Sequence, residues 1–274
     1  MEDELSESRR IRAVAPDGVE IVGAVTGEGP ALLLVYGAMM EQTGWERLLP
    51  HLPGHAVYTY DRRGRGESGN TREYSVRREV DDLQAFAALV PRPFDVFAHS
   101  SGVLLALHAV MQGLDPRRMV LYEPPIASTR EPPLPPDLGA RILDLAGAGD
   151  RDGALEAFMR EGMWFTAEDV ARLRASPRWQ DQLRYAETGA YDVILHATFE
   201  LRAEALAKIA VPMLMLMGAE SPPWMQAGVR RLADLLPDCP LEAMPAQGHN
   251  PQFTAPDVLG KRIVEFLRRP AGRS

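Results

Sequence analysis

Short apolar runs alternate with amphipathic segments along most of the 274-residue chain. The runs are almost continuous in Val, Leu, Ile and Met, which is typical of strands buried on both faces of a sheet. Seven strands are predicted on this basis, at residues 19–25, 31–35, 56–60, 94–98, 118–122, 212–217 and 241–244.

Segments with helical periodicity separate these strands, at residues 44–49, 76–89, 102–111, 225–236 and 257–267. The last helix has a recognisable start, with Thr254 as the expected N-cap and Pro256 just inside the helix. Regular alternation of strand and helix predicts an α/β fold, with a mostly parallel central sheet flanked by helices on both faces.

One stretch interrupts the alternation. Six prolines lie between Pro124 and Pro136, and prolines at this density exclude regular structure. Helical periodicity without strand signals follows, at residues 138–145, 153–163, 167–173, 180–185 and 193–206. We therefore predict one core domain formed by residues 1–127 and 208–274, with an inserted helical cap over residues 128–207.

Composition narrows the class of protein. A 46% hydrophobic fraction can fill a sizeable core, and a formal charge of −8 argues against broad binding to nucleic acid or anionic membranes. The chain has no uninterrupted apolar run of the roughly 18 residues that a membrane span needs, and Met1–Arg10 lacks the apolar stretch of an export signal. With a single cysteine, Cys239, we expect a cytoplasmic protein. The sequence leaves open whether it forms a homo-oligomer.

The strongest chemical motif is the segment FDVFAHSSG at residues 94–102, which runs from a buried strand into an apolar helix. A serine at such a sharp turn exposes its hydroxyl above the sheet, provided that small residues lie two positions before and after it. Of ten serines, only Ser100 meets this condition, with Ala98 and Gly102. The alternative is an ordinary serine turn that caps the helix. In the first interpretation, the N–H of Ser101 faces the substrate as an oxyanion donor.

Four motifs in order resemble the α/β-hydrolase superfamily with a helical cap. They are LLLVYGA at 32–38, DRRGRGESG at 61–69, AHSSG at 98–102 and the Gly248-His249 pair. The resemblance covers nearly the whole chain and implies a hydrolase with a serine nucleophile. In that family the chain order is serine, acid and histidine.

A serine needs a neighbouring base to remove its proton. Among six histidines, His249 satisfies the chain order, because it follows the last strand and precedes the C-terminal helix. The other five are set aside: His99 as a turn residue, His108 as a packing residue, His51 and His55 as surface residues, and His196 as a residue of the cap.

The acid that orients this histidine has two candidates. Ser221 occupies the position where most of the family has aspartate, and Glu220 lies one residue earlier. Glu123, at the end of the strand 118–122, resembles the acid of haloalkane dehalogenases and zearalenone-type lactonases. We favour Glu123 over Glu220, although a salt bridge to Arg62 or Arg63 would also explain a carboxylate there.

The resemblance also implies substrate contacts. Ala38 would supply the second oxyanion N–H, and Tyr36 replaces the histidine common in that loop. Tyr36 and Met39 could line an apolar pocket, with Trp164 from the aromatic part of the cap as a wall. Loop or core packing would explain these three residues equally well or better.

We therefore expect a serine hydrolase that cleaves an ester or lactone of an apolar small molecule through an acyl-enzyme. No histidine, cysteine and carboxylate cluster has metal-ligand spacing, and no dinucleotide fingerprint follows the first strand, so we expect neither metal nor cofactor. The alternatives are a non-hydrolytic cyclase or lyase of the same fold, and a ligand-binding protein with little turnover.

Overall fold

The computed structural model describes residues 8–71 and 73–269. Its centre is an eight-stranded sheet in the order β1-β2-β4-β3-β5-β6-β7-β8. The strands are β1 Arg9–Val14, β2 Glu20–Thr26, β3 Ala31–Val35, β4 Ala56–Tyr60, β5 Phe94–His99, β6 Met119–Tyr122, β7 Met213–Gly218 and β8 Leu241–Met244.

Strands β3 to β8 pair in parallel, whereas β2 is antiparallel to both β1 and β4. The predicted α/β class with a mostly parallel sheet is therefore confirmed. The sequence pattern does not predict β1, because Arg9, Arg10 and Arg12 interrupt any apolar run there. Ala13 is its one buried residue. Such a half-exposed strand at a sheet edge is polar on most of its positions.

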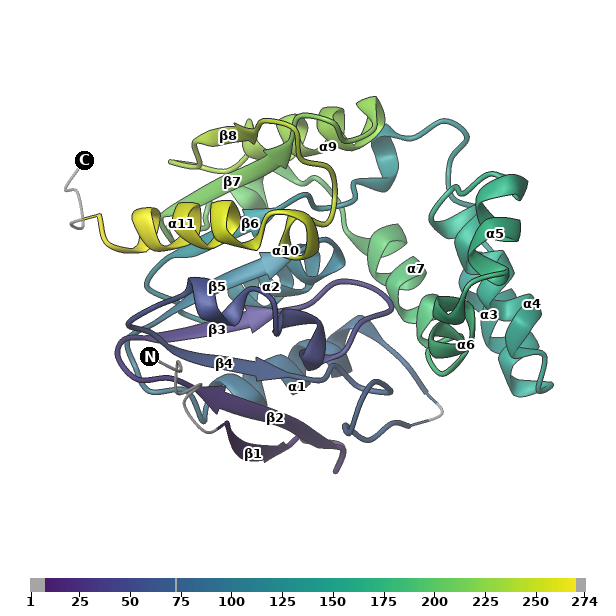
Figure 1. Cartoon of the computed structure of the whole chain (residues 1–274), viewed down its shortest axis with the longest axis horizontal. Coiled ribbons are helices and arrows are strands. Elements are labelled where there is room, and N and C mark those ends of the chain that lie inside the picture. Colours follow the sequence, from purple (N-terminus) through teal and green to yellow (C-terminus); the bar gives the residue numbers. More distant parts are fainter. Residues whose placement is uncertain (1–7, 72, 270–274) are drawn as a thin grey trace.

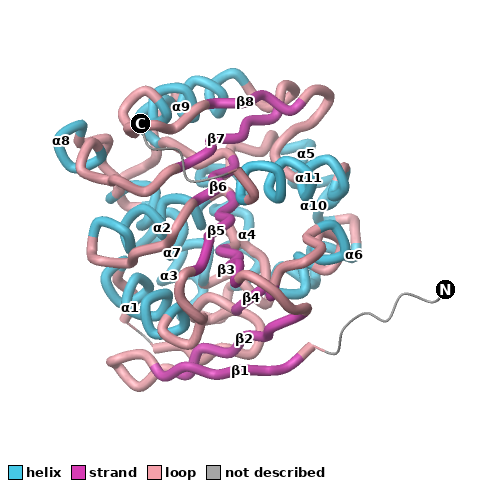
Figure 2. Tube along the Cα trace, turned by 90° about the vertical axis from the view of Figure 1, so that its left-hand side faces the viewer, coloured by secondary structure: helices cyan, strands magenta, loops and turns pink. Residues whose placement is uncertain are grey.

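Alternate residues of each central strand pack on opposite faces of the sheet. Leu33 and Val35 contact the cluster formed with helices α1 (Val76–Ala87), α2 (Ser101–Met111) and α9 (Pro223–Ala233). Leu32 and Leu34 belong to the other cluster, with α11 (Pro256–Leu267) and the short turns η1 (Gln42–Trp45) and η2 (Leu49–His51). Figure 2 shows α1 and α2 on one side of the strands, and α10 (Pro251–Thr254) and α11 on the other.

Two predicted helix details are wrong. The segment 44–49 forms the 3-10 turns η1 and η2 instead of one helix. Thr254 is the last residue of α10, and the N-cap of α11 is Ala255, which makes no side-chain cap bond. The hydroxyl of Thr254 instead donates to Gln247 Oε1 over 2.8 Å. Since the residue before a proline is kept out of the helical region, Ala255 separates the two helices.

Between β6 and β7 the chain forms the turn η3 (Ala127–Thr129) and then a series of helices. They are α3 Leu138–Gly147, α4 Arg151–Ala157 with the π-helical turn η4 Phe158–Gly162, α5 Ala167–Arg174, α6 Pro177–Leu183, α7 Thr188–Thr198 and α8 Ala203–Leu206. We call α3 to α7 the inserted helices. The predicted helix 193–206 is thus two helices, α7 and α8.

The inserted helices lie beyond the carboxyl ends of the parallel strands (Figure 1). They share an apolar cluster that contains Leu138, Ile142, Leu155, Phe158 and Trp179. The division into core and cap at the stated residues stays a prediction. In the described part of the chain, no helix is both long enough and apolar enough to cross a membrane.

Removing a side chain from the sheet core should destabilise the protein. Leu33→Ala, at a fully buried position, should lower the free energy of unfolding by about 2–5 kcal/mol, because it leaves a cavity in β3. Leu89→Ala, where the side chain is 44% exposed, is the matched control and should change it by less than about 1 kcal/mol. Guanidinium denaturation of both variants measures the difference, and equal losses would contradict this packing.

Candidate active site

Ser100 stands at a strained turn between β5 and α2. Its backbone has φ +56° and ψ −130°, a region that residues other than glycine rarely occupy. The turn requires close backbone approach, since a Cβ on Gly102 would lie 2.5 Å from the carbonyl oxygens of Val35 and Tyr36. The N–H of Ser100 donates to the Tyr122 carbonyl over 2.8 Å. These contacts hold the Ser100 side chain at the carboxyl edge of the sheet.

His249 and Glu123 meet Ser100 at this edge. His249 Nε2 lies 3.0 Å from Ser100 Oγ, and His249 Nδ1 lies 2.8 Å from Glu123 Oε2. Since the carboxylate accepts, Nδ1 carries the proton and Nε2 is left to accept from the serine hydroxyl. Glu123 is fully buried, and its Oε1 accepts the N–H of Gly218 over 2.6 Å. Like Ser100, Glu123 has a positive φ, of +46°.

Within the described residues, the carboxylate that pairs with His249 is that of Glu123, not that of Glu220. The Glu220 side chain is exposed, and its backbone N–H donates to the Gln247 carbonyl. The salt bridge that was the alternative role for Glu123 is absent from the described residues, because both arginines pair with other carboxylates. Arg62 pairs with Glu79 and Asp192, and Arg63 pairs with Asp17 and Asp82.

Two aromatic side chains hold the loop that carries His249. The Tyr122 hydroxyl donates to the Gly248 carbonyl over 2.5 Å, and His99 Nε2 donates to the His249 carbonyl over 2.7 Å. Burial and the neighbouring His249 lower the pKa of His99 to about 3, so His99 is neutral. Sequence reasoning set His99 aside. Its position next to Ser100, at the end of the predicted strand, was the only sequence signal that connected it with this site.

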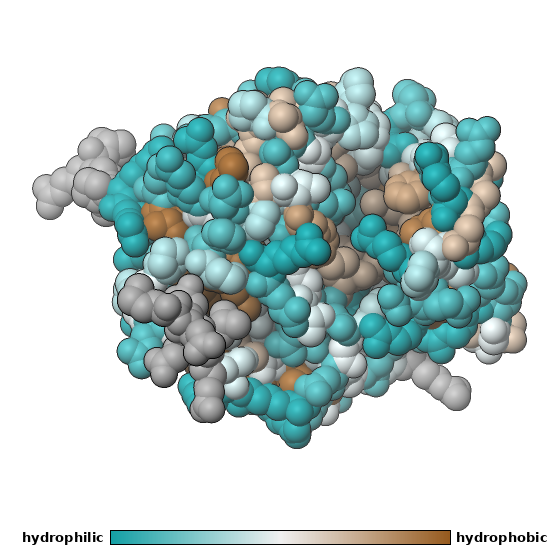
Figure 3. All heavy atoms as spheres, in the orientation of Figure 1, coloured by the Kyte–Doolittle hydropathy of each residue, from teal (hydrophilic) through white to brown (hydrophobic). Residues whose placement is uncertain are grey.

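A small cavity of about 20 Å³ lies against Ser100 and His249, which is room for about one water molecule. It is lined by Ala38, Ser100, Pro125, Gly162, Met163, Trp164, His196, Trp224, Met225 and His249. Figure 3 shows moderately hydrophobic side chains in the hollow between the sheet side of the molecule and the inserted helices. The cavity wall is mostly apolar and comes from both parts of the chain.

The structure brings some predicted contact residues to this cavity and not others. Ala38 and Trp164 line it, and Trp164 also has a positive φ, of +58°. Tyr36 is instead buried in the sheet core, with its ring 3.9 Å from that of Trp45. Met39 packs into the apolar cluster of the inserted helices. Backbone direction in the loop after β3 decides which of these neighbours faces the serine, and residue type does not reveal it.

His196 on α7 is a cavity residue that sequence reasoning missed. It is buried, its Nε2 has no hydrogen-bond partner, and burial lowers its pKa to about 4. A spacing of four residues places it on the same side of α7 as Asp192. That helical spacing was visible in the sequence, but which side of α7 faces the serine was not.

A buried ionic network joins the inserted helices to the core. Asp192 accepts from Arg62 over 3.0 Å, from Arg65 over 2.6 Å and from the Ser101 hydroxyl over 2.7 Å. Arg62 also donates to Glu79 on α1 over 2.6 Å. Two cations thus face two anions, as a buried network requires. The Ser101 side chain therefore points into this network, away from the cavity.

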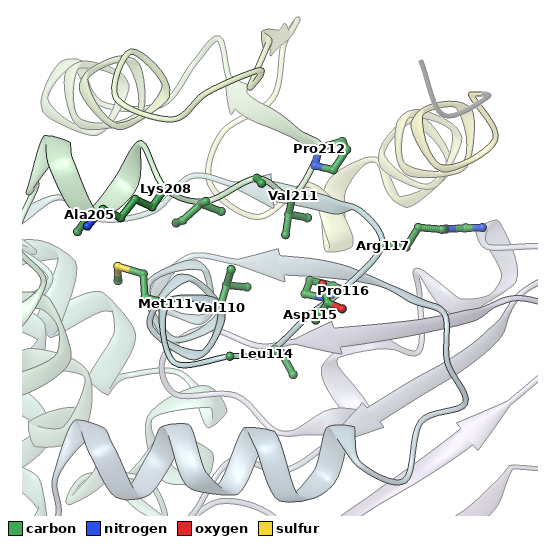
Figure 4. Close-up of a pocket in the computed structure, with 13 residues that line it drawn as sticks. Val110, Met111, Leu114, Asp115, Pro116, Arg117, Ala205, Lys208, Val211 and Pro212 are labelled. Carbon is green, nitrogen blue, oxygen red and sulfur yellow. The ribbon is translucent and has the colours of Figure 1, made fainter. Parts of the chain in front are cut away.

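A larger hollow lies at the opposite edge of the sheet. It has a volume of about 650 Å³ and is lined by Val110, Met111, Leu114, Asp115, Lys208 and Val211 among others (Figure 4). Val110 and Met111 end α2, and the other residues precede β6 or β7, so the hollow is at the amino ends of the strands. Within residues 8–71 and 73–269, no group of three or more histidine, cysteine or carboxylate side chains could hold a metal ion.

Comparison with known proteins identifies the class. Residues 32–261 match the sequence pattern of the Alpha/beta hydrolase family. The structure is similar to that of an alpha/beta hydrolase from Sphaerobacter thermophilus, with a TM-score of 0.85 and 35% sequence identity over 94% of this chain and 100% of that one. The chain therefore belongs to the α/β-hydrolase family, and it is an enzyme of that family.

More distant relatives carry more specific descriptions. A putative carbamate hydrolase, RutD, from Agrobacterium fabrum is 23% identical over 255 residues, which covers 90% of this chain and 97% of the relative. The crystal structure of an enol-lactonase from Burkholderia xenovorans shares the fold, with a TM-score of 0.72 and 19% identity over 94% of this chain and all of that one.

The neutral, buried His99 should make stability depend on pH. Below about pH 6.5 the unfolded chain protonates this histidine, whereas the folded chain does so only near pH 3. The free energy of unfolding should therefore fall as the pH drops from 7.5 to 5. In His99→Gln the fall should be smaller, by on the order of 1 kcal/mol. Urea denaturation at both pH values measures this, and an equal fall in both proteins would contradict it.

Proposed function

We propose that the protein is a serine hydrolase that cleaves a carboxylic ester or lactone of a largely apolar small molecule through an acyl-enzyme. The observation that carries this proposal is the unbroken chain of hydrogen bonds from Ser100 Oγ through His249 to the buried Glu123. A serine, a base and an acid that orients the base are the groups that acyl transfer requires.

In this mechanism Ser100 Oγ attacks the carbonyl carbon, and its proton passes to His249 Nε2. Glu123 stabilises the imidazolium that forms and keeps it in position. When the tetrahedral intermediate collapses, His249 gives the proton to the leaving oxygen. A water molecule then attacks the acyl carbon while His249 takes its proton, and when the bond to Ser100 breaks, His249 returns that proton to Ser100 Oγ and the acid leaves.

The oxyanion of that intermediate would be held by the backbone N–H groups of Ala38 and Ser101. The close approach of their loops supports this assignment, since a Cβ on Gly37 would lie 2.7 Å from Ser100 Cβ. Ser101 is the first residue of α2, where backbone N–H groups and the helix dipole favour negative charge.

The apolar cavity wall supports an apolar substrate. Met163 and Met225 adapt their shape easily, and the indoles of Trp164 and Trp224 offer flat apolar surfaces. Because the cavity holds about one water molecule, a substrate must displace these side chains as it binds.

The named relatives support cleavage at a carbonyl group in general, of which ester cleavage is one case. Carbamates and enol lactones both contain a carbonyl carbon bonded to a heteroatom leaving group. Reaction in ¹⁸O-labelled water separates hydrolysis from the cyclase or lyase alternative, because only hydrolysis places solvent oxygen in the product.

Replacing the nucleophile should remove activity. Ser100→Ala should lower kcat for an aryl ester by at least about 10⁴-fold, since only the oxyanion donors and binding remain. A fluorescent phosphonate should label the wild-type protein and not the variant, as read by intact-protein mass spectrometry. Equal labelling of both proteins would contradict the assignment of Ser100.

The two candidate acids can be compared directly. Glu123→Gln should lower kcat by about 10³- to 10⁴-fold, because the amide cannot stabilise the imidazolium and favours the wrong tautomer. Glu220→Gln, the matched control on the exposed neighbouring loop, should stay within about twofold of the wild type. Steady-state kinetics on one aryl ester measures both, and a near-normal rate for Glu123→Gln would overturn the choice of acid.

A further inference from the structure

Arg130 lies at the boundary between the core and the inserted helices, against two tryptophans of the cavity wall. Its guanidinium carbon is over the ring of Trp164 and 3.9 Å from the centroid of the Trp224 ring. Trp164 follows the turn η4, and Trp224 belongs to α9 of the core. The two indole centroids are 5.6 Å apart, so the cation is wedged between rings from both parts of the chain.

This arginine is buried without an acceptor. Arg130 is 7% exposed, and its Nε and Nη1 atoms have no hydrogen-bond partner. In the described part of the chain the other buried arginines all donate to an oxygen. Arg62, Arg63 and Arg65 donate to carboxylates, and Arg118 donates to the Leu267 carbonyl.

A buried cation without a counter-charge is unfavourable, and burial lowers the pKa of Arg130 to about 9. At neutral pH the group is still charged. Cation–π contact with two indoles stabilises its faces, but leaves Nε and Nη1 without an acceptor. A carboxylate would supply what these groups lack, because it accepts a strong charge-assisted hydrogen bond from a guanidinium N–H.

We propose that Arg130 binds a carboxylate on the substrate, at the end remote from the carbonyl that Ser100 attacks. The inference rests on the proposed function and deepens it, since the substrate becomes an ester or lactone with an apolar body and one anionic group. Trp164 and Trp224 connect the two positions, because both line the cavity at Ser100 and both contact Arg130. The apolar body lies along the indoles, and the carboxylate supplies the missing acceptor.

Substrate pairs that differ only in terminal charge test this proposal. The p-nitrophenyl esters of butyrate, hexanoate and octanoate are compared with the mono-p-nitrophenyl esters of succinate, adipate and suberate. For at least one chain length, kcat/KM should be about 10- to 100-fold higher for the charged ester, the range expected of a buried charge-assisted pair. The ratio of charged to neutral kcat/KM is the quantity compared between proteins.

Variants of Arg130 locate the effect. Arg130→Met keeps an unbranched chain between the indoles and should reduce the ratio to about one or below, whereas Arg130→Lys keeps the charge without the planar fork and should retain part of it. Arg269→Met is the matched control, because Arg269 also lies over an aromatic ring, that of Phe266, on α11. It should leave the ratio unchanged. Circular dichroism verifies that each variant is folded.

The outcomes separate this inference from the proposed function. Cleavage of both ester series without a charge preference, or a preference that survives in both Arg130 variants, overturns the carboxylate site and leaves the hydrolase proposal intact. If the wild type cleaves no ester, tryptophan fluorescence titration with adipate and suberate decides the question. Binding that is lost in Arg130→Met supports the site, and no binding by the wild type overturns it.

Discussion

The backbone conformation at Ser100 is the constraint on which the site depends. A positive φ at this residue is unfavourable, so the surrounding contacts must enforce it. Gly102 packs closely against the carbonyls of Val35 and Tyr36. Gly37 packs closely against the serine itself. Larger residues at either glycine would move the loop after β3 away from the turn. The strain places one hydroxyl above the carboxyl edge of the sheet, and parallel pairing brings the ends of β6 and β8 to that same edge.

Near the carboxyl ends of the strands, the described buried arginines are paired with carboxylates and the buried histidines are neutral, with one exception. The Arg62, Arg65, Glu79 and Asp192 network is electrically balanced and fixes α7 on the core. Closer to the serine, His99 and His196 are kept neutral by desolvation, so in the proposed mechanism neither adds a positive charge beside the imidazolium of His249. Arg130 is the exception, a buried cation without a counter-charge of its own. The ionic network is therefore balanced in charge without a further partner, whereas Arg130 lacks an acceptor that a bound ligand would supply.

How much of this could be predicted from the sequence differs from element to element. Strands β3 and β4 match their predicted ranges, because buried strands are almost continuous apolar runs. Strand β8 matches as well, although only Met244 in it is buried. Strand β1 and the turns η1 and η2 were missed or mistaken, because a half-exposed edge strand and short 3-10 turns lack a distinctive period. The Ser100 turn and His249 carried motif and chain-order signals. His99 and His196 carried only weak signals, in the neighbouring Ser100 and in the spacing from Asp192, and Arg130 carried none, because the importance of all three arises from contacts with residues distant in sequence.

The sequence by itself therefore determined the α/β class and the family, and it selected the candidate serine and histidine, since apolar runs, small residues around a turn and the order of motifs along the chain are local properties. Only the tertiary structure decided that Glu123 rather than Glu220 reaches His249, that Tyr36 is buried in the core, and that Arg130 meets two tryptophans without an acceptor. The physical reason is the same in each case. A side chain's partner depends on which loops converge at the carboxyl edge of the sheet and which way each backbone turns there, and those are long-range properties of the folded chain.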